Sequence, residues 1–432
     1  MFRYFEALPS LGRRLRVATP CMGIDGAGHA LKLLKCPADI INCYDLEDSY
    51  RSCLTKHLHS MGMQVVELHV GKIDGNLLSV PLTSLSRPVD FLISGPPCPP
   101  WAGQGKHKGR ADPKADVFMA VVSWVIFLVG SGGLLGVVLE NVPGIMSETS
   151  DGHESVGAVF LKVLRKYCPE FDWVVDKLEL VNYLHPQTRV RVFIRGLRKV
   201  ICQCVPPPLQ SFGRRSLKEA LGLSPYTPRN VLSVPQQQNL KDAEAEAKKL
   251  HAAGKVNLCD LIVVPVDRSW DEDIQYNASL SVNQCPTLTT HNVYLFVLEV
   301  GDVINNIEDS QRTYFRKITD PERLALQGFP PNLALDLPPN RIVFAAGNAF
   351  PPPLIAALLH PMLKAMGAST FSLASWPPSE ILSDAEPPHL AKAMKELRSP
   401  GKIVNREKFE AAKMLKMRGN NSKKRRRNDE GE

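Results

Sequence analysis

The chain has 432 residues, of which 44% are hydrophobic and 22% are charged, and its formal net charge is +8. This length predicts two or three domains and is ample to bury a core. Ten cysteines occur without a C-x-x-C pair, and no secretory signal is present. This pattern argues against a disulfide-stapled secreted domain and against a zinc or other metal site, and it favours reduced thiols inside a cell.

The first predicted strand, Leu15 to Ala18, leads into the glycine-rich segment CMGIDGAGHALKLL. A glycine-rich turn between a strand and a helix lets a cofactor approach the backbone and the helix N-terminus. The next apolar run ends in INCYDLED, where Glu47, or less favourably Asp45, is placed to accept hydrogen bonds from a ribose. The two segments predict a cofactor site with contacts from Cys21, Gly23, Asp25, Gly26 and Glu47.

Residues 90–105, DFLISGPPCPPWAGQG, contain the most informative cysteine of the chain. The apolar run Phe91 to Ile93 predicts a buried strand, which stops at Gly95-Pro96-Pro97 because proline cannot donate to a sheet ladder. Cys98 is therefore expected on a stiff loop beyond the carboxyl end of a strand, where open α/β sheets place their ligand crevices. Taken alone, the Pro-Cys pair fits a packed cysteine as well as a functional one.

Residues 117–139 carry no charge and are numerous enough to span a membrane. Glycines at 130, 132 and 133 instead divide the stretch into a helix and a buried parallel strand, Leu134 to Leu139. Glu140 and Asn141 then stand where that strand ends. A carboxylate that only caps the next turn is the alternative for Glu140.

The sequence QTRVR at 187–191 lies between two apolar segments, Leu178 to Leu184 and Val192 to Ile194, which predict strands. A thiol, a carboxylate and two arginines, Arg189 and Arg191, are thus each expected at a strand edge. An ordinary solvated basic pair is the alternative for the arginines.

The order of these motifs resembles the cytosine-5 methyltransferase family. Pro97-Cys98, Glu140-Asn141-Val142 and Gln187-x-Arg189-x-Arg191 match its three catalytic motifs. Two further matches are RKITDPERLALQGFP at 316–330 and GNAFPPPL at 347–354. The matches lie within residues 15–200 and 285–360, more than half of the chain, and they follow the family's order.

The resemblance implies a role for each catalytic side chain. Cys98 would add as a thiolate to position 6 of cytosine, which makes position 5 nucleophilic toward a methyl sulfonium. Glu140 would hold or donate a proton at ring nitrogen 3. Arg191 would stabilise the ring's carbonyl oxygen, and Arg189 would orient the loop or hold a phosphate.

The resemblance also implies S-adenosylmethionine as the methyl donor. Thr19, Cys21 and Asp25 stand where the family usually has an acid, an aromatic residue and a glycine. Lys72 stands where the family usually has an aspartate, and we expect Asp74 to take its place at the adenine. The remaining expected donor contacts are Pro96, Asn348 and Ala349.

The expected fold is α/β: a doubly wound, mostly parallel, Rossmann-like sheet with a smaller target-recognition domain. The expected parts are an N-terminal extension (1–14), a catalytic domain (15–200), a recognition domain (201–334), a return to the catalytic domain (335–370) and a tail (371–432). LKDAEAEAKKLHAAG in the recognition region predicts a short exposed helix, and Leu354 to Met366 predicts an apolar helix after the closing motif. The extension has no room for a chromatin-reading module, so targeting is expected from the recognition region, the tail or a protein partner.

Four residues are expected to contact nucleic acid. The segment CPTLTTHN at 285–292 resembles the threonine-rich end of the family's recognition region, and its threonines would contact phosphates or hold a flipped nucleotide. An ordinary edge strand is an equally good interpretation. The expected contacts are Gln187, Thr287, Thr289 and Thr290.

The C-terminal 32 residues hold most of the positive charge. From Gly401 to Glu432 there are 11 Lys or Arg and 5 Asp or Glu, a net charge of +6. KKRRR at 423–427 predicts a nuclear import signal, hence a nuclear protein, or a loose nucleic-acid contact. A solvated disordered end is the alternative.

We therefore expect a DNA cytosine-5 methyltransferase that flips its target base out of a duplex. An RNA cytosine-5 methyltransferase is the second candidate, although the Cys-Phe-Thr signature usual in the family's tRNA-methylating branch is not found. A catalytically silent nucleic-acid-binding adaptor is the third, favoured only by the altered cofactor motif.

Overall fold

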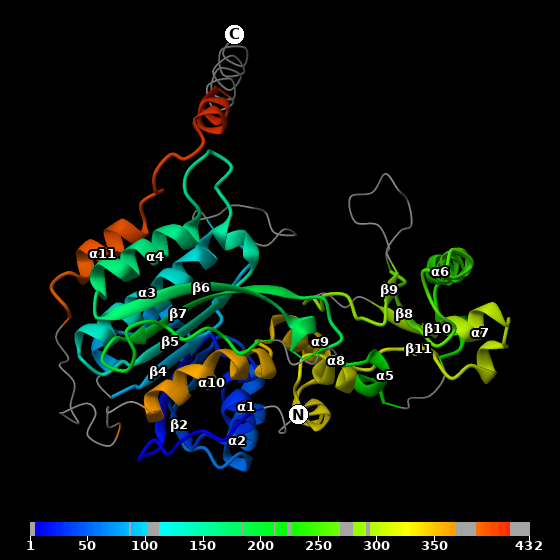
Figure 1. Cartoon of the computed structure of the whole chain (residues 1–432), viewed down its shortest axis with the longest axis horizontal. Helices are drawn as coiled ribbons and strands as arrows, with labels where there is room; N and C mark the ends of the chain where they lie inside the picture. The colour runs from blue at the N-terminus through cyan, green and yellow to red at the C-terminus, as the bar shows by residue number, and fades with distance from the viewer. Residues whose placement is uncertain are drawn as a thin grey trace, which may run out of the picture.

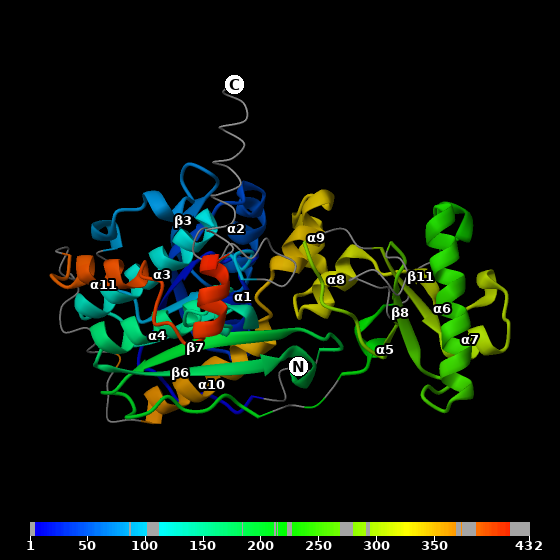
Figure 2. The same cartoon turned by 90° about the horizontal axis from the view of Figure 1, so that it is seen from above.

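The computed structural model describes residues 5–85, 88–101, 112–183, 185–210, 213, 215–222, 227–267, 280–290, 294–368, 373 and 386–414. Within these ranges the chain forms a larger and a smaller domain that lie side by side (Figures 1 and 2).

The larger domain is built on a seven-stranded sheet with the order β3-β2-β1-β4-β5-β7-β6. Its strands are β1 (Leu15–Pro20), β2 (Ala38–Asp45), β3 (Val65–Val70), β4 (Phe91–Ser94), β5 (Gly136–Asn141), β6 (Phe171–Glu179) and β7 (Val190–Arg198). All neighbouring strands are parallel except β5–β7 and β6–β7, so β7 runs against the other six. The mostly parallel sheet expected from the sequence is confirmed.

Helices cover both faces of this sheet (Figure 1). They are α1 (Gly26–Leu33), α2 (Arg51–Ser60), α3 (Pro113–Gly130), α4 (Val156–Tyr167), α10 (Pro352–Ala368) and α11 (Leu390–Leu397). Phe91 and Ile93 of β4 belong to the core that contains α1, α2 and α10, whereas Leu92 belongs to the core that contains α3, α4 and α11. Strand side chains alternate between faces, so a continuous apolar run here means burial on both.

Helix α3 is, by itself, the one helix in the described part of the chain that is long and apolar enough to cross a membrane. Most of its side chains from Ala115 to Val129 are buried against the sheet and its neighbours α4 and α11. It ends at Gly130, and β5 follows after a glycine-containing turn, as the sequence predicted. Its apolarity is thus satisfied by the core of the larger domain.

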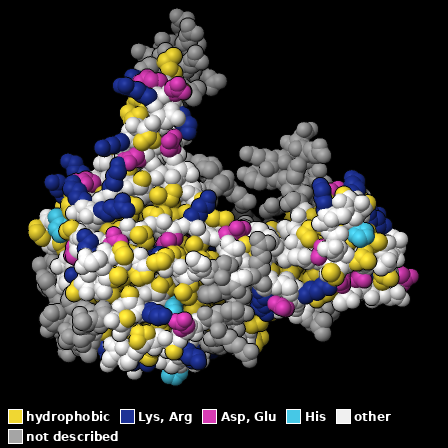
Figure 3. Space-filling model, in the orientation of Figure 1, with side chains coloured by type: hydrophobic (Ala, Val, Ile, Leu, Met, Phe, Trp, Pro, Cys, Tyr) yellow, Lys and Arg dark blue, Asp and Glu magenta, His cyan; other side chains and the backbone are white. Residues whose placement is uncertain are grey.

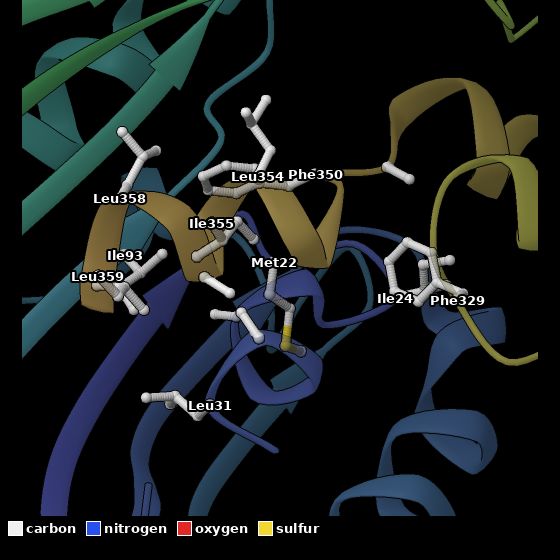
Figure 4. Close-up of a cluster of buried hydrophobic side chains, with 14 of the residues drawn as sticks. Met22, Ile24, Leu31, Ile93, Phe329, Phe350, Leu354, Ile355, Leu358 and Leu359 are labelled. Atoms are coloured by element: carbon white, nitrogen blue, oxygen red, sulfur yellow. The ribbon is translucent and has the colours of Figure 1, made fainter. Parts of the chain in front are cut away.

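Helix α10 carries the chain back onto the glycine-rich turn that follows β1. Figure 4 shows Ile355 of α10 beside Met22 of that turn, within one buried cluster. A Cβ atom added at Gly26 would lie 1.9 Å from the carbonyl oxygen of Phe350, so α1 and the start of α10 can meet this closely only at a glycine. The apolar helix predicted after the closing motif is present as α10, and it packs on α1.

The smaller domain contains a four-stranded antiparallel sheet with the order β11-β10-β8-β9. Its elements are α5 (Leu217–Ala220), α6 (Val234–Ala252), β8 (Leu261–Pro265), β9 (Ser281–Val282), β10 (Leu295–Glu299), α7 (Val300–Ile304) and β11 (Phe315–Lys317). The segment that returns to the larger domain holds α8 (Asp320–Leu326), the 3-10 helix η10 (Pro331–Asp336) and α9 (Pro339–Asn348). We call residues 320–348 the return segment.

The other 3-10 helices of the described residues are short. They are η2 (Asp48–Tyr50), η3 (Leu77–Ser79), η4 (Leu82–Leu85), η6 (Pro143–Met146), η7 (Leu180–Asn182), η8 (Arg229–Val231) and η9 (Asp309–Gln311).

Two predicted elements differ from the structure. The strand expected at Leu178 to Leu184 is wrong, because β6 ends at Glu179 and η7 follows; Leu184 itself lies outside the described residues. β6 is an edge strand with polar side chains, so its sequence is less apolar than the buried turn after it. The short helix expected at 240–254 is the larger part of α6, which begins earlier, at Val234, behind a capping box between Ser233 and Gln236.

The described part of the predicted tail, residues 386–414, packs on the larger domain. Glu396 of α11 accepts hydrogen bonds from Lys166 Nζ (2.6 Å) and from the Tyr167 hydroxyl (2.8 Å) of α4. The backbone of 402–405 then pairs with the turn at 152–154 after β5. Figure 3 shows Lys and Arg side chains gathered over this side of the molecule. KKRRR at 423–427 lies outside the described residues.

We expect α11 to contribute to the stability of the larger domain. Leu397→Ala removes a fully buried side chain and should lower the free energy of unfolding by about 2–4 kcal/mol. Lys392→Ala, on the exposed side of the same helix, should change it by less than about 0.5 kcal/mol. Chemical denaturation of the two variants and the wild type tests this; equal midpoints would mean that α11 does not pack as described.

Candidate active site

The loop after β4 holds Cys98 at the centre of the sheet's carboxyl edge. Cys98 is half-buried, and its carbonyl accepts a hydrogen bond from the Trp101 backbone N–H (3.0 Å). The side-chain amide of Asn141, the last residue of β5, donates to the Pro96 carbonyl (3.2 Å). The end of β5 therefore fixes the position of the loop that carries the thiol.

Glu140 and Arg191 form an ion pair next to this loop. Arg191 Nε and Glu140 Oε1 are 2.7 Å apart, and each side chain is only 11% exposed. The other carboxylate oxygen, Oε2, lies 3.3 Å from where a Cβ of Gly95 would be, so it borders the start of the Cys98 loop. β5 and β7 are antiparallel neighbours, so the end of β5 lies beside the start of β7 and the two side chains meet at one edge of the sheet.

Arg189 is buried and connects three segments. Its guanidinium donates to the carbonyl oxygens of Leu288 (3.1 Å), Gly347 (3.0 Å from Nη1) and Ala349 (3.0 Å). These carbonyls belong to the threonine-rich segment (Leu288), to the last turn of α9 (Gly347) and to the residue just after α9 (Ala349). Burial, followed by the nearby Arg191, lowers the pKa of Arg189 from its usual value. Of the two roles expected for Arg189, its contacts match that of orienting the loops.

The charges around Cys98 act in opposite directions. Burial is the main reason that the pKa of the Cys98 thiol is raised above its usual value, and the Glu140 carboxylate raises it further. Arg191 and Arg189 act to lower it. At neutral pH Cys98 is therefore a thiol, and a change in the charge of Glu140 directly affects how readily it ionises.

The glycine-rich turn lies beside the ends of β1 and β2. Cys21 adopts a positive φ of 57° and donates its backbone N–H to the Tyr44 carbonyl (2.8 Å). The Gly23 N–H donates to Asp45 Oδ2 (2.8 Å), and the Glu47 N–H donates to Asp45 Oδ1 (2.9 Å). Asp45 thus uses both oxygens on backbone amides, which leaves Glu47 as the stronger of the two ribose candidates.

Asp25 caps α1 from within the core. It has a left-handed φ of 56°, is 2% exposed and accepts a hydrogen bond from the Gly28 N–H (3.0 Å). A Cβ at Gly28 would lie 1.9 Å from Asp25 Oδ2, so the carboxylate fills the space of a missing side chain. Burial raises the pKa of Asp25 to about 6. Its place is a structural cap, although the sequence grouped it with the donor contacts.

Glu47 and Asp74 stand just beyond the ends of neighbouring strands, and each carboxylate lies near an arginine: Asp74 Oδ2 is 3.6 Å from Arg51 Nη2 of α2, and Glu47 is near Arg341 of α9. Glu47 Oε1 accepts from the Ser49 hydroxyl (2.7 Å), and Oε2 lies 3.4 Å from Arg341 Nη1. The Asp74 carboxylate is half exposed and is held 2.7 Å from His69 Nδ1.

Sequence reasoning missed two apolar side chains near these acids. Leu46 is 49% exposed and Ile73 is 94% exposed. The turn that carries Ile73 packs on the end of β2, because the Gly71 N–H donates to the Asp45 carbonyl (2.9 Å). Apolar residues inside the polar turns DLED and GKIDG were the available signal. Arg341, on the return segment, was also missed because nothing local in the sequence points to Glu47.

The residues expected to contact nucleic acid are not equally placed. Gln187 is fully buried and its backbone bridges to Cys285, so the threonine-rich segment runs beside the edge of the sheet that holds Cys98, Glu140 and Arg191, which we call the catalytic edge. The Thr287 hydroxyl donates to the Thr188 carbonyl. Thr289 and Thr290 are half-buried and pack by their backbone on Gly347, while Asn348 is exposed and Ala349 is buried.

Comparison with known proteins decides the family. Residues 22–364 match the family model described as C-5 cytosine-specific DNA methylase. The chain belongs to this family. It is a DNA cytosine-5 methyltransferase, the activity expected from the motif order, and methyltransferases of this kind use S-adenosylmethionine.

Bacterial relatives of the methylase cover most of its length. The Type II methyltransferase M.HaeII of Haemophilus aegyptius is 25% identical over 65% of this chain and 76% of its own. The Type II methyltransferase M.NgoBI of Neisseria gonorrhoeae is 26% identical over 62% of this chain and 72% of its own.

Solved structures agree with the fold of the methylase. The Entamoeba histolytica methyltransferase EhMeth superposes with a TM-score of 0.51 at 15% identity, over 81% of this chain and 98% of that protein. A mutant of the DNMT2 protein of Spodoptera frugiperda gives a TM-score of 0.51 at 16% identity, over 81% and 99%. At these identities the likeness supports the fold alone.

The charges around the thiol of the methylase lead to a pH prediction. Glu140→Gln removes a negative charge and should lower the pKa of Cys98, whereas Arg191→Gln removes a positive charge and should raise it. Because the thiolate reacts, alkylation of the Cys98 peptide at pH 8 should be faster in the first variant and slower in the second. Mass spectrometry follows the reaction, with the exposed Cys204 as an internal control. Equal rates of Cys98 alkylation in the wild type and both variants would contradict the proposed effect of these charges on the pKa of Cys98.

Proposed function

We propose that the methylase modifies carbon 5 of a cytosine in duplex DNA through a covalent adduct with Cys98. The observation that carries this proposal is the meeting of the Cys98 loop, Glu140 and Arg191 at one strand edge. A thiol beside a carboxylate–guanidinium pair is the set of groups that addition to a cytosine ring requires.

The proton balance follows from the charges of the resting site. Cys98 is a thiol and must lose its proton when sulfur bonds to ring position 6, while ring nitrogen 3 must gain one. We infer that Glu140 takes up a proton as the thiol is consumed and presents it to nitrogen 3, so the site and ring together keep their net charge. Arg191 is held by Glu140 through Nε and by the Val190 carbonyl through Nη1 (2.8 Å), so its Nη2 group is the one that would donate to the ring's carbonyl oxygen.

The residues at the ends of β1, β2 and β3 fit a nucleoside methyl donor. Gly23 has a positive φ of 56° and nothing lies within 4 Å of where its Cβ would be, so the turn leaves open space beside the backbone. Glu47 offers a carboxylate to ribose hydroxyls, and Leu46 and Ile73 offer apolar surface to an adenine ring. S-adenosylmethionine, when bound there, supplies the activated methyl group for attack by ring carbon 5.

The substrate cytosine must leave the base stack to reach Cys98. The sulfur lies on a half-buried loop, and position 6 of a stacked cytosine cannot approach it. We propose that the smaller domain and the segment 285–290 hold the flanking strand, since Arg189 fixes that segment to the catalytic edge. RNA remains a second substrate class for the same chemistry, and the experiment below separates the two.

Mechanism-based trapping tests the adduct. With methyl donor and a mixed-sequence duplex pool containing 5-fluorocytosine, the wild type should form an adduct stable to denaturation, because fluorine blocks the final elimination. Cys98→Ser should form none. Glu140→Gln and Arg191→Ala should form it about 100-fold more slowly.

Two controls define the outcome of the trapping experiment. Cys285→Ser alters a buried cysteine that packs beside Gln187, and it should still give the adduct. A fluorinated tRNA pool tests the second substrate class, and an adduct on RNA alone would overturn the DNA assignment. No adduct on either pool, with donor binding demonstrated, would favour a silent adaptor.

We further propose that the methylase is nuclear and that its basic end directs it there. Removing residues 420–432 should reduce nuclear accumulation, and it should make the salt dependence of DNA binding shallower by up to about 0.9 per lost phosphate contact. Replacing the five cations at 423–427 with glutamine keeps the length and should act alike. Fluorescence microscopy and binding titrations measure the two effects. If the nuclear accumulation and the salt dependence of DNA binding were both unaltered, the basic segment would have neither function.

A further inference from the structure

The donor end of the proposed site contains a carboxylate held from two sides. Glu47 follows β2 and caps η2: its Oε1 accepts both the hydroxyl of Ser49 (2.7 Å) and the Ser49 N–H (3.4 Å). A carboxylate oxygen has two lone pairs, so Oε1 is fully used within the larger domain. Oε2 is the oxygen that remains for a ligand.

The return segment reaches this second oxygen. Arg341, in the first turn of α9, places Nη1 3.4 Å from Glu47 Oε2, and its guanidinium lies 6.0 Å from the ring centre of Phe344. The Glu47 side chain is 21% exposed and that of Arg341 is 43% exposed. The pair is therefore at the surface of the donor site, where an incoming ribose can reach it.

A third group at this corner, unlike the paired Glu47 and Arg341, lacks a hydrogen-bond partner among the described residues. The Tyr50 hydroxyl is buried and makes no hydrogen bond in the described part of the chain. Burial is the main cause of the raised pKa of Tyr50. Asp45 and Glu47 raise this pKa further and Arg341 lowers it, so all three charged groups lie near the Tyr50 hydroxyl. An unsatisfied buried hydroxyl beside an ion pair is typical of a site that a polar ligand completes.

We propose that Arg341 is a positioning residue for the methyl donor: through Glu47 Oε2 it orients the carboxylate that receives the donor's ribose. With Ser49 on one oxygen and Arg341 on the other, the plane of the carboxylate is set before the ribose arrives. This inference rests on the proposed donor site. It adds that the segment joined to the smaller domain takes part in donor binding.

The fold provides a matched control for a merely structural effect. Asp336 of η10 joins the same return segment to the same side of the larger domain through Lys56 (2.7 Å) and His57 (2.9 Å) of α2. Asp336→Asn should weaken that attachment but leaves the Glu47–Arg341 pair in place. If Arg341 served only to dock the return segment, Arg341→Ala and Asp336→Asn would have the same effect on donor binding.

The experiment is calorimetric binding of S-adenosylhomocysteine and of its analogue without the two ribose hydroxyls. Arg341→Ala should weaken S-adenosylhomocysteine about two- to fivefold, the range expected for a partly exposed ion pair. The same change should leave the affinity for the dideoxy analogue unaltered, because that ligand makes no use of the carboxylate. Arg341→Lys should restore part of the loss, and Asp336→Asn should cause none.

Two further outcomes decide the proposal. In a Glu47→Gln background, Arg341→Ala should have no additional effect, since the group through which it acts has been neutralised. Equal losses for both ligands, tighter binding in Arg341→Ala, or wild-type affinity in that variant would each overturn the role of Arg341 while the methylase activity stands. A wild type that binds neither ligand would overturn the donor site and this inference together.

Discussion

The buried guanidinium of Arg189 is the interaction on which the organisation of the site depends. It is the point where the start of β7, the threonine-rich segment and the end of α9 with the turn after it come together, through carbonyls of Leu288, Gly347 and Ala349. A planar cation with several N–H groups can satisfy three carbonyls at once, which an ammonium group does with far less geometric control. Without it, three buried carbonyls would lose their donors, at a cost of about 1–3 kcal/mol each.

The catalytic edge separates fixed groups from chemically adjustable ones. Arg189 and Asn141 are committed to backbone carbonyls and set the shape of the edge. The Cys98 thiol has a pKa that its neighbours shift, Glu140 upward and Arg191 downward, and Arg191 is also ion-paired with Glu140. Rigid surroundings let a small number of protons move without reorganisation of the site.

Much of this arrangement could be predicted from the sequence because a parallel strand that is buried on both faces has a continuous apolar sequence. Continuous apolar runs marked β4 and β5, and the residues just beyond them, Cys98 and Glu140, had to lie at one edge once both strands were placed. The glycine-rich turn and the apolar helix that closes the domain were equally visible. The DNA methylase family followed from the order of the motifs.

What the sequence could not supply was any contact set by distant packing. Asp25 looked like part of a cofactor turn, yet its left-handed backbone directs the carboxylate into the core. The edge strand β6 was misplaced because its polar residues interrupt the apolar pattern by which a buried strand is predicted. Arg341 meets Glu47 only because the return segment crosses to α2, nearly 300 positions along the chain, and no local pattern encodes such a crossing.

The contact between Asp25 and Gly28 also constrains how this turn can change in evolution. The carboxylate occupies the volume that a side chain at residue 28 would need, so the residues allowed at the two positions are coupled. An alanine at 28 would require the Asp25 carboxylate to leave its capping position, so this change costs less in a lineage that has already replaced the acid with a smaller residue. The order of substitutions is thereby restricted, and chimaeras that exchange only half of the turn between relatives would place both groups in the same space.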